Sequence, residues 1–195
     1  MFTLAPCAAG CGRPAITGSQ LCALHVADTE KEGRRIGEYI SQRRVIKNLN
    51  APGLHFESVD FSQRQYFSCN FTEASFDMCL FTGSLMRMVF FDFCRFESCD
   101  FSKTDLQFLS FAGGRFLNCT FEGSELVHLN YGGANIKGCT FNNSNLYNSR
   151  FIKAELCQSD FVDCNLKKTN FIRTRQETVA FKSSNTAEAI FELEE

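Results

Sequence analysis

A bulky apolar side chain occupies every fifth position from Phe56 to Phe171, without one interruption. Phe is the commonest residue at these positions, and Tyr, Met, Leu or Ile fill the others. Neither an α-helix, with about 3.6 residues per turn, nor a strand, with its two-residue alternation, produces that spacing. A short fixed repeat is typical of a solenoid, in which each unit buries its apolar residue only by stacking on its neighbours.

The residues around each bulky position follow a pattern of their own. A small residue usually stands two places before it, and Asp or Asn often stands directly before it, as in Cys99-Asp100-Phe101. This pattern resembles the pentapeptide repeat family over residues 54–173. The resemblance implies an all-β solenoid, a right-handed quadrilateral β-helix with four pentapeptides in each coil.

Sorting the bulky residues by a 20-residue period supports four pentapeptides per coil independently. One resulting column contains only Phe, and a second contains none. The all-Phe column is Phe61, Phe81, Phe101, Phe121, Phe141 and Phe161. Such homogeneous columns indicate that residues 20 apart are stacked neighbours, and about six coils at roughly 4.8 Å each would form a rod about 29 Å long.

The chain has 11 cysteines, and seven of them occupy the small position of the repeat. The 20-residue period places Cys79, Cys99, Cys119 and Cys139 in one column, where their spacing would allow either a disulfide or metal ladder. The alternative, which we favour, is that these thiols are small buried side chains with raised pKa values and little reactivity. An odd number of cysteines, mostly in the core, indicates reduced thiols and a cytoplasmic protein.

Four metal-ligand residue types lie outside the repeat, at the N-terminus. Cys7, Cys11, Cys22 and His25 form a complete set for tetrahedral zinc, and the Cys-x2-His spacing is usual for such a site. Because all four positions would be filled by protein, the zinc would be structural. Three incidental cysteines in a flexible tail are the alternative.

The segment from Asp28 to Asn48 has the pattern of an amphipathic helix, with Asp28 or Thr29 as its N-cap. Ile36, Ile40 and Ile46 are among its apolar residues. We expect this helix, braced by the zinc module, to cover the open N-terminal end of the solenoid.

After Phe171 the five-residue phase weakens, because Gln176 stands at a core position. The last ten residues, TAEAIFELEE, indicate a short helix that would either cap the final coil or form a homodimer, since related pentapeptide proteins often pair tail to tail. The predicted divisions are a zinc module at 1–27, a capping helix and linker at 28–53, the solenoid at 54–173 and a C-terminal cap or dimerisation segment at 174–195.

Apolar residues at outward positions indicate where a partner would bind. They concentrate in the second coil and extend along its neighbours through Phe67, Val127 and Tyr147. The predicted patch is Leu80, Leu85, Met88, Phe90, Phe93 and Phe108. It is either a protein-binding surface or the bed on which the N-terminal helix lies.

No catalytic arrangement is recognisable, because His55 and His128 stand at outward positions without an acid or nucleophile in phase. No segment is apolar enough to span a membrane. The solenoid and its patch therefore favour a non-enzymatic interaction module or adaptor for an unidentified protein partner.

Two alternative functions remain open. The resemblance includes a branch of DNA-mimicking regulators of gyrase, a type II topoisomerase. Such a mimic needs a strongly acidic rod, whereas residues 51–175 contain 13 acidic and 12 basic residues. Nucleic-acid binding would use the basic cluster of the N-terminal helix, and we consider it weaker because that cluster is small. The cluster is Arg34, Arg35, Arg43, Arg44 and Lys47.

Overall fold

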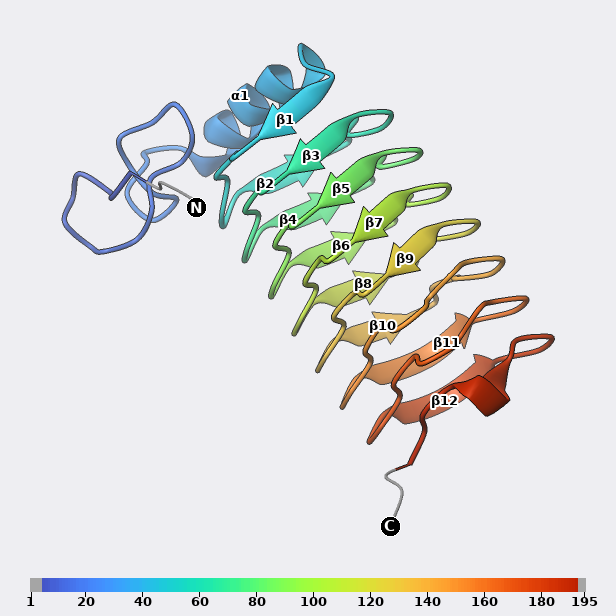
Figure 1. The fold of residues 1–195 in the computed structure, drawn as a ribbon. Coiled ribbons are helices and arrows are strands. Elements are labelled where there is room, and N and C mark those ends of the chain that lie inside the picture. The colour runs from blue at the N-terminus through green and yellow to red at the C-terminus, as the bar shows by residue number, and fades with distance from the viewer. Residues whose placement is uncertain (1–4, 193–195) are drawn as a thin grey trace.

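The computed structural model describes residues 5–192 and shows a rod of stacked coils, with one helix and a loop-rich module at its N-terminal end (Figure 1). The coils contain two parallel sheets on opposite sides of the rod. Five strands form one sheet, in the order β1 (Val45–Lys47), β3 (Gln65–Phe67), β5 (Leu85–Arg87), β7 (Asp105–Gln107) and β9 (Glu125–Val127). Seven form the other: β2 (His55–Glu57), β4 (Ser75–Asp77), β6 (Arg95–Glu97), β8 (Arg115–Leu117), β10 (Asn135–Lys137), β11 (Glu155–Asp160) and β12 (Arg175–Ala180).

Two further faces complete the square cross-section, and each consists of single bridging residues 20 apart. One row includes the bridges of Leu80 to Asp60 and Asp100, and we call it the Leu80 face. The other includes the bridges of Phe90 to Asn70 and Ser110, and we call it the Phe90 face. Along the chain the order is the seven-strand face, the Leu80 face, the five-strand face and the Phe90 face. The predicted four-sided parallel β-solenoid is confirmed, with about seven turns rather than six.

The core consists of the bulky residues that define the repeat. Phe101 is fully buried and stacks between Phe81 and Phe121, with ring centroids 4.2 and 4.8 Å away and interplanar angles of 3° and 8°. Neighbouring columns meet edge to face, as Phe96 and Phe101 do at 74°. Stacked and edge-to-face rings add to the stabilisation that burial provides.

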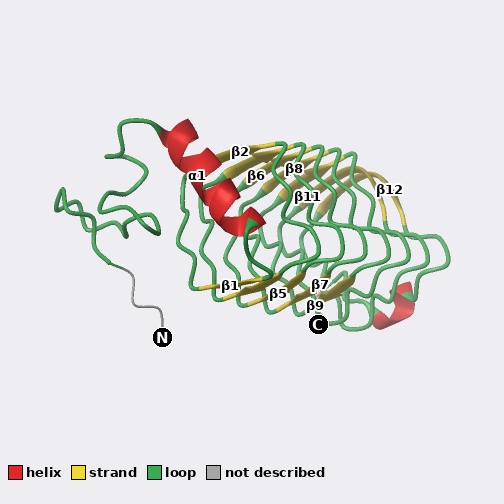
Figure 2. Ribbon diagram, turned by 90° about the horizontal axis from the view of Figure 1, so that it is seen from above, coloured by secondary structure: helices red, strands yellow, loops and turns green. Residues whose placement is uncertain are grey.

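The helix α1 (Thr29–Ser41) lies across the N-terminal end of the rod (Figure 2). Asp28 is its N-cap, and its carboxylate accepts a hydrogen bond from the Lys31 N–H. Ile36 and Ile40 are fully buried and join the solenoid core. The expected capping position is therefore observed.

The predicted end of the helix was wrong. The helix stops at Ser41, and Val45 and Ile46 belong to β1, which pairs in register with β3. Ile46 and Ala51 stand at the two core positions that precede Phe56 in the five-residue repeat, and both are fully buried. The solenoid thus begins within the segment that the sequence assigned to a capping helix and linker.

The C-terminal helix was also wrong over the described residues. The only helical turn there is the 3-10 turn η1 (Thr186–Glu188). The coils continue beyond it, since Ile190 bridges to Asn170 and Phe191 stacks on Phe171 with centroids 5.1 Å apart. Residues 193–195 of the predicted helix lie outside the described residues.

Candidate metal centre and interaction surface

Cys7, Cys11, Cys22 and His25 come together at the N-terminal module. Their ligand atoms all lie within 4.8 Å of one another. The Cys7 and Cys22 sulfurs are 3.6 and 3.3 Å from His25 Nδ1, and the Cys11 and Cys22 sulfurs are 3.6 Å apart. A tetrahedron with zinc–sulfur bonds of about 2.3 Å has edges of about 3.8 Å, shorter where nitrogen replaces sulfur. The four residues therefore have the spacing of a metal site.

Tight turns place these ligands. The Gly10 N–H donates to the Cys7 carbonyl, and Gly10 and Gly12 have φ angles of 73° and 75°, which glycine adopts without strain. The Cys22 N–H donates to the Cys7 sulfur over 3.4 Å. This bond is the largest of several hydrogen bonds that together lower the pKa of Cys7 to about 6, while burial raises the pKa of Cys22. Backbone N–H donors to sulfur stabilise a thiolate, the form that binds metal.

The predicted apolar patch does not lie on one face. Leu80 is on the Leu80 face and Leu85 is on the five-strand face. Phe90 is on the Phe90 face, and Phe93 turns the corner beyond it towards the seven-strand face. Only Met88 and Phe108 share a column, 20 residues apart, and they are 53% and 58% exposed.

Met88 and Phe108 begin an apolar ridge along the corner between the five-strand face and the Phe90 face. The Phe108 ring stacks on His128 at 5.0 Å and 6°, and His128 meets Tyr147 edge to face at 5.8 Å. We call these four residues the corner ridge. His128 lies outside the predicted patch, although its 20-residue spacing from Phe108 is the sequence signal for this stack.

The alternative that the N-terminal helix covers the patch is wrong. The helix packs against β2 at the end of the rod. Its Gly33 and Gly37 lie against His55 and Val59 of the first coil. Met88, Phe93 and Phe108 each remain more than half exposed.

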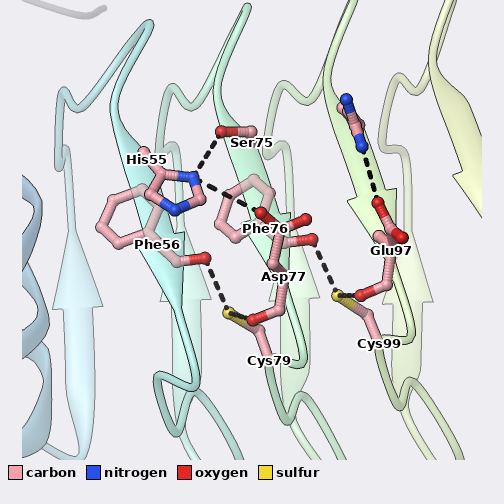
Figure 3. Close-up of polar contacts among 9 residues, drawn as sticks. His55, Phe56, Ser75, Phe76, Asp77, Cys79, Glu97 and Cys99 are labelled. Atoms are coloured by element: carbon pink, nitrogen blue, oxygen red, sulfur yellow. Dashed lines mark hydrogen bonds and ion pairs between the residues drawn. The ribbon is translucent and has the colours of Figure 1, made fainter.

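His55 does have polar partners, contrary to the sequence analysis. Ser75 Oγ is 2.8 Å and Asp77 Oδ2 is 3.6 Å from the same atom, His55 Nδ1 (Figure 3). A catalytic triad needs the acid and the nucleophile on different ring nitrogens. The arrangement is therefore a ladder of outward side chains on β2 and β4, without the geometry for nucleophilic catalysis.

The basic cluster of the sequence analysis is dispersed and largely engaged within the protein. Arg35 donates to Glu32 and to the Thr17 carbonyl. Arg43 lies over the Tyr39 ring, and Lys47 lies over Phe67. Arg34 pairs with Glu30 at 3.7 Å. Four of the five basic side chains thus have partners within the protein.

The column of stacked cysteines belongs to the core. All 11 cysteines are free, and the four thiols of the column are at most 2% exposed. The Cys99 thiol donates to the Phe76 carbonyl at 3.2 Å, and Cys79 donates in the same way to Phe56 (Figure 3). These thiols act as small buried side chains with a backbone acceptor, and the disulfide ladder is absent.

These features define a class: a parallel β-solenoid with an N-terminal helical cap and a Cys3His cluster beside it. Residues 114–191 match the family model for a pentapeptide repeat region. The coils before residue 114 continue the same parallel stacking, and the resemblance to the pentapeptide repeat family seen in the sequence is confirmed over the matched residues.

Solved structures of pentapeptide repeat proteins are similar at low identity. QnrB1, a plasmid-mediated fluoroquinolone resistance protein, is 17% identical, with 75% of this chain and 77% of that chain covered and a TM-score of 0.49. HetL, involved in heterocyst differentiation regulation in the cyanobacterium Nostoc sp. strain PCC 7120, is 10% identical, with coverages of 82% and 96% and a TM-score of 0.37. Rfr23 from the cyanobacterium Cyanothece 51142 is 14% identical, with coverages of 77% and 97% and a TM-score of 0.37. These values are too low to transfer a function.

No curated protein matches this sequence. Among the described residues, no helix combines the length and apolar character that crossing a membrane requires.

Proposed function

We propose that this protein is a non-enzymatic interaction module that binds a protein partner through the corner ridge. The supporting observation is the pair of exposed apolar side chains, Met88 and Phe108, continued by His128, which stacks on Phe108, and by Tyr147, which meets His128 edge to face. Solenoids bind partners through extended surfaces of this kind, and exposed aromatic residues and Met are enriched at protein interfaces.

The backbone conformation at this corner is one that Met and Phe adopt only at a cost in energy. Met88 and Phe108 have φ angles of 54° and 59°, in the left-handed region that Gly and Asn adopt more easily. The same corner column contains Asn48 and Asn148, which suit that conformation. Apolar side chains at Met88 and Phe108 thus cost conformational energy and expose apolar surface, a combination that binding would offset.

The test is a pull-down from native lysate with the wild-type chain and with a Met88→Asp/Phe108→Asp double variant. A partner that uses the ridge should be retained by the wild type and lost from the variant, because the carboxylates would be buried without counter-ions. Met78→Asp is the matched control, since Met78 is 54% exposed with a φ of 52° on the opposite corner. Equal retention of the partner by all three proteins would refute the ridge.

We also infer that the Cys3His cluster binds one structural zinc ion. The support is the set of ligand-atom separations, which match the edges of a zinc tetrahedron, together with the softness of three thiolates and one imidazole. Metal analysis of the purified protein should give about one equivalent of zinc per chain. A Cys22→Ser/His25→Ala variant should contain much less, and a wild-type content below about half an equivalent would contradict the assignment.

A homodimer through the C-terminal coil is a second proposal about partners. Phe181 and Phe191 stack on the preceding coil yet stay only partly buried, and β12 pairs with β11 alone among the described strands. An open parallel edge with partly exposed rings is suited to association. Light scattering should give twice the mass of one chain, with the monomer mass restored by Phe191→Asp.

Gyrase regulation by DNA mimicry is the less favoured alternative, because acidic and basic residues nearly balance in the repeat region. A gyrase supercoiling assay with micromolar protein tests it directly. The buried free thiols support the further proposal of a reducing compartment such as the cytoplasm.

A further inference from the structure

The loop between the second and third metal ligands lies against the first coil of the solenoid. The Thr17 N–H donates to the Asn50 carbonyl over 2.8 Å, and the Asn50 N–H donates to Thr17 Oγ1 over 2.8 Å. The Asn50 side-chain Nδ2 donates to the Ala15 carbonyl over 2.6 Å. Asn50 is 2% exposed, so three of its polar groups are buried and satisfied by this loop.

The same loop also joins the solenoid core and the capping helix. Ile16 is 1% exposed and belongs to the main core cluster. The Thr17 carbonyl accepts a hydrogen bond of 2.7 Å from Arg35 of α1, and Glu32 holds that guanidinium. Arg13 forms an ion pair with Glu73 of the second coil at 3.3 Å. One short segment, residues 13–17, therefore contacts two coils and the helix.

Asn50 lies at the open N-terminal edge of the solenoid, where no preceding coil among the described residues pairs with it. It begins the row of bridges on the Phe90 face, and its partner within the row is Asn70 of the next coil. On its other side the coil would present an unpaired backbone edge, which is prone to association with other chains. The helix covers the side at β2, and the loop supplies the hydrogen bonds at Asn50.

The metal ligands fix both ends of this loop. Cys11 precedes residues 13–17 and Cys22 follows them, with their sulfurs 3.6 Å apart. Backbone bonds between Cys7 and Arg13 and between Ala5 and Ala15 brace the loop from the other side. A bound metal would remove the conformational freedom of a loop closed at Cys11 and Cys22, whereas three adjacent thiolates without a metal would repel one another.

We propose that metal binding at the Cys3His cluster holds the loop of residues 13–17 against the N-terminal edge of the solenoid through the contacts between Thr17 and Asn50. We call this coupling the latch. The proposal rests on the metal binding proposed above. Because both events order the same loop, metal binding strengthens docking of the loop, and docking strengthens metal binding by the same factor.

The first test is hydrogen exchange of the wild-type chain with one equivalent of zinc and after its removal by a strong chelator. The Asn50 and Thr17 amides should lose at least about tenfold in protection when zinc is removed. The Phe121 amide, which donates to the Thr140 carbonyl in the middle of the rod, is the internal control and should not change. Unchanged protection at Asn50 in a chain that does bind zinc would overturn the latch.

The second test uses reciprocity. Thr17→Val removes the hydroxyl that Asn50 uses and leaves all four ligands in place, so zinc affinity should fall about fivefold, the value of one hydrogen bond. Thr174→Val is the matched control, because Thr174 hydrogen-bonds the Phe171 carbonyl at the far end of the rod. Equal zinc affinities for Thr17→Val and wild type would overturn the latch alone, whereas a wild-type chain that binds no zinc would overturn both the zinc assignment and the latch.

Discussion

At the scale of single residues, a stacked Phe in the middle of the rod should be more important for stability than an exposed one. Phe101→Ala removes a ring that is fully buried between Phe81 and Phe121. We expect a loss of about 3–5 kcal/mol in the free energy of unfolding, since the adjacent coils cannot close the cavity without losing their register.

Urea unfolding followed by circular dichroism would measure this loss, because the chain contains no Trp. Phe93→Ala provides the comparison: Phe93 is 67% exposed, and its removal should change the free energy of unfolding by no more than about 0.5 kcal/mol. Similar losses for the two variants would contradict the stacked core.

At the scale of elements, two glycines of α1 should respond in opposite ways to the same substitution. A Cβ on Gly33 would overlap the backbone carbonyl oxygen of His55, whereas a Cβ on Gly37 would lie 3.5 Å from the Val59 side chain, an ordinary contact. Gly33→Ala should therefore displace the helix and cost about 1–3 kcal/mol. Gly37→Ala should stabilise by up to about 1 kcal/mol, because Ala is the better helix former.

Thermal unfolding of the two variants beside wild type would measure the difference. Equal effects of Gly33→Ala and Gly37→Ala would show that the helix does not pack closely on β2. The difference between the two glycines has no sequence signal, because a single sequence does not show that β2 approaches Gly33 backbone to backbone.

The elements that the sequence predicted well are those with a long uninterrupted period. The columns of Phe and Leu indicated the coils correctly, since stacking needs only a constant 20-residue spacing. Both ends were misjudged for the same reason. Ile46 and Ala51 are too few and too small to extend the pattern of Phe residues, and Ile46 also suited a helical spacing. At the other end, Gln176 interrupted the pattern, although β12 keeps its register with β11.

At the scale of the whole molecule, the candidate site was predictable only in part. The four ligands stood out because their residue types and spacing suffice to indicate a metal site. The patch did not keep its predicted form, because the square cross-section turns by one face every five residues and so separates Leu80 from Phe90. The contact between Thr17 and Asn50 had no sequence signal, since it depends on how the module docks on the rod.

The buried thiols give the whole fold a pH dependence. Burial raises the pKa of Cys69 to about 11, and it also raises the pKa values of Cys94 and Cys164. In the unfolded chain these thiols ionise near pH 9, whereas in the folded chain they keep their protons. Between the two pKa values the folded state binds more protons, so the free energy of unfolding falls as pH rises. This stabilisation is complete below about pH 8 and is lost progressively as the pH rises from the unfolded pKa through the folded pKa.

Urea unfolding at pH 7.5 and pH 9.5 under reducing conditions would measure this effect, at values below the ordinary pKa of Tyr. Each buried thiol that stays protonated contributes a loss of up to about 1.4 kcal/mol per pH unit above its unfolded pKa. Cys69→Ala should reduce the loss, whereas Cys157→Ala should not, because Cys157 is partly exposed and lies outside the core. A free energy of unfolding that stays constant between the two pH values would mean that these thiols ionise as readily in the folded chain as in water. That outcome would contradict the prediction that burial keeps them protonated.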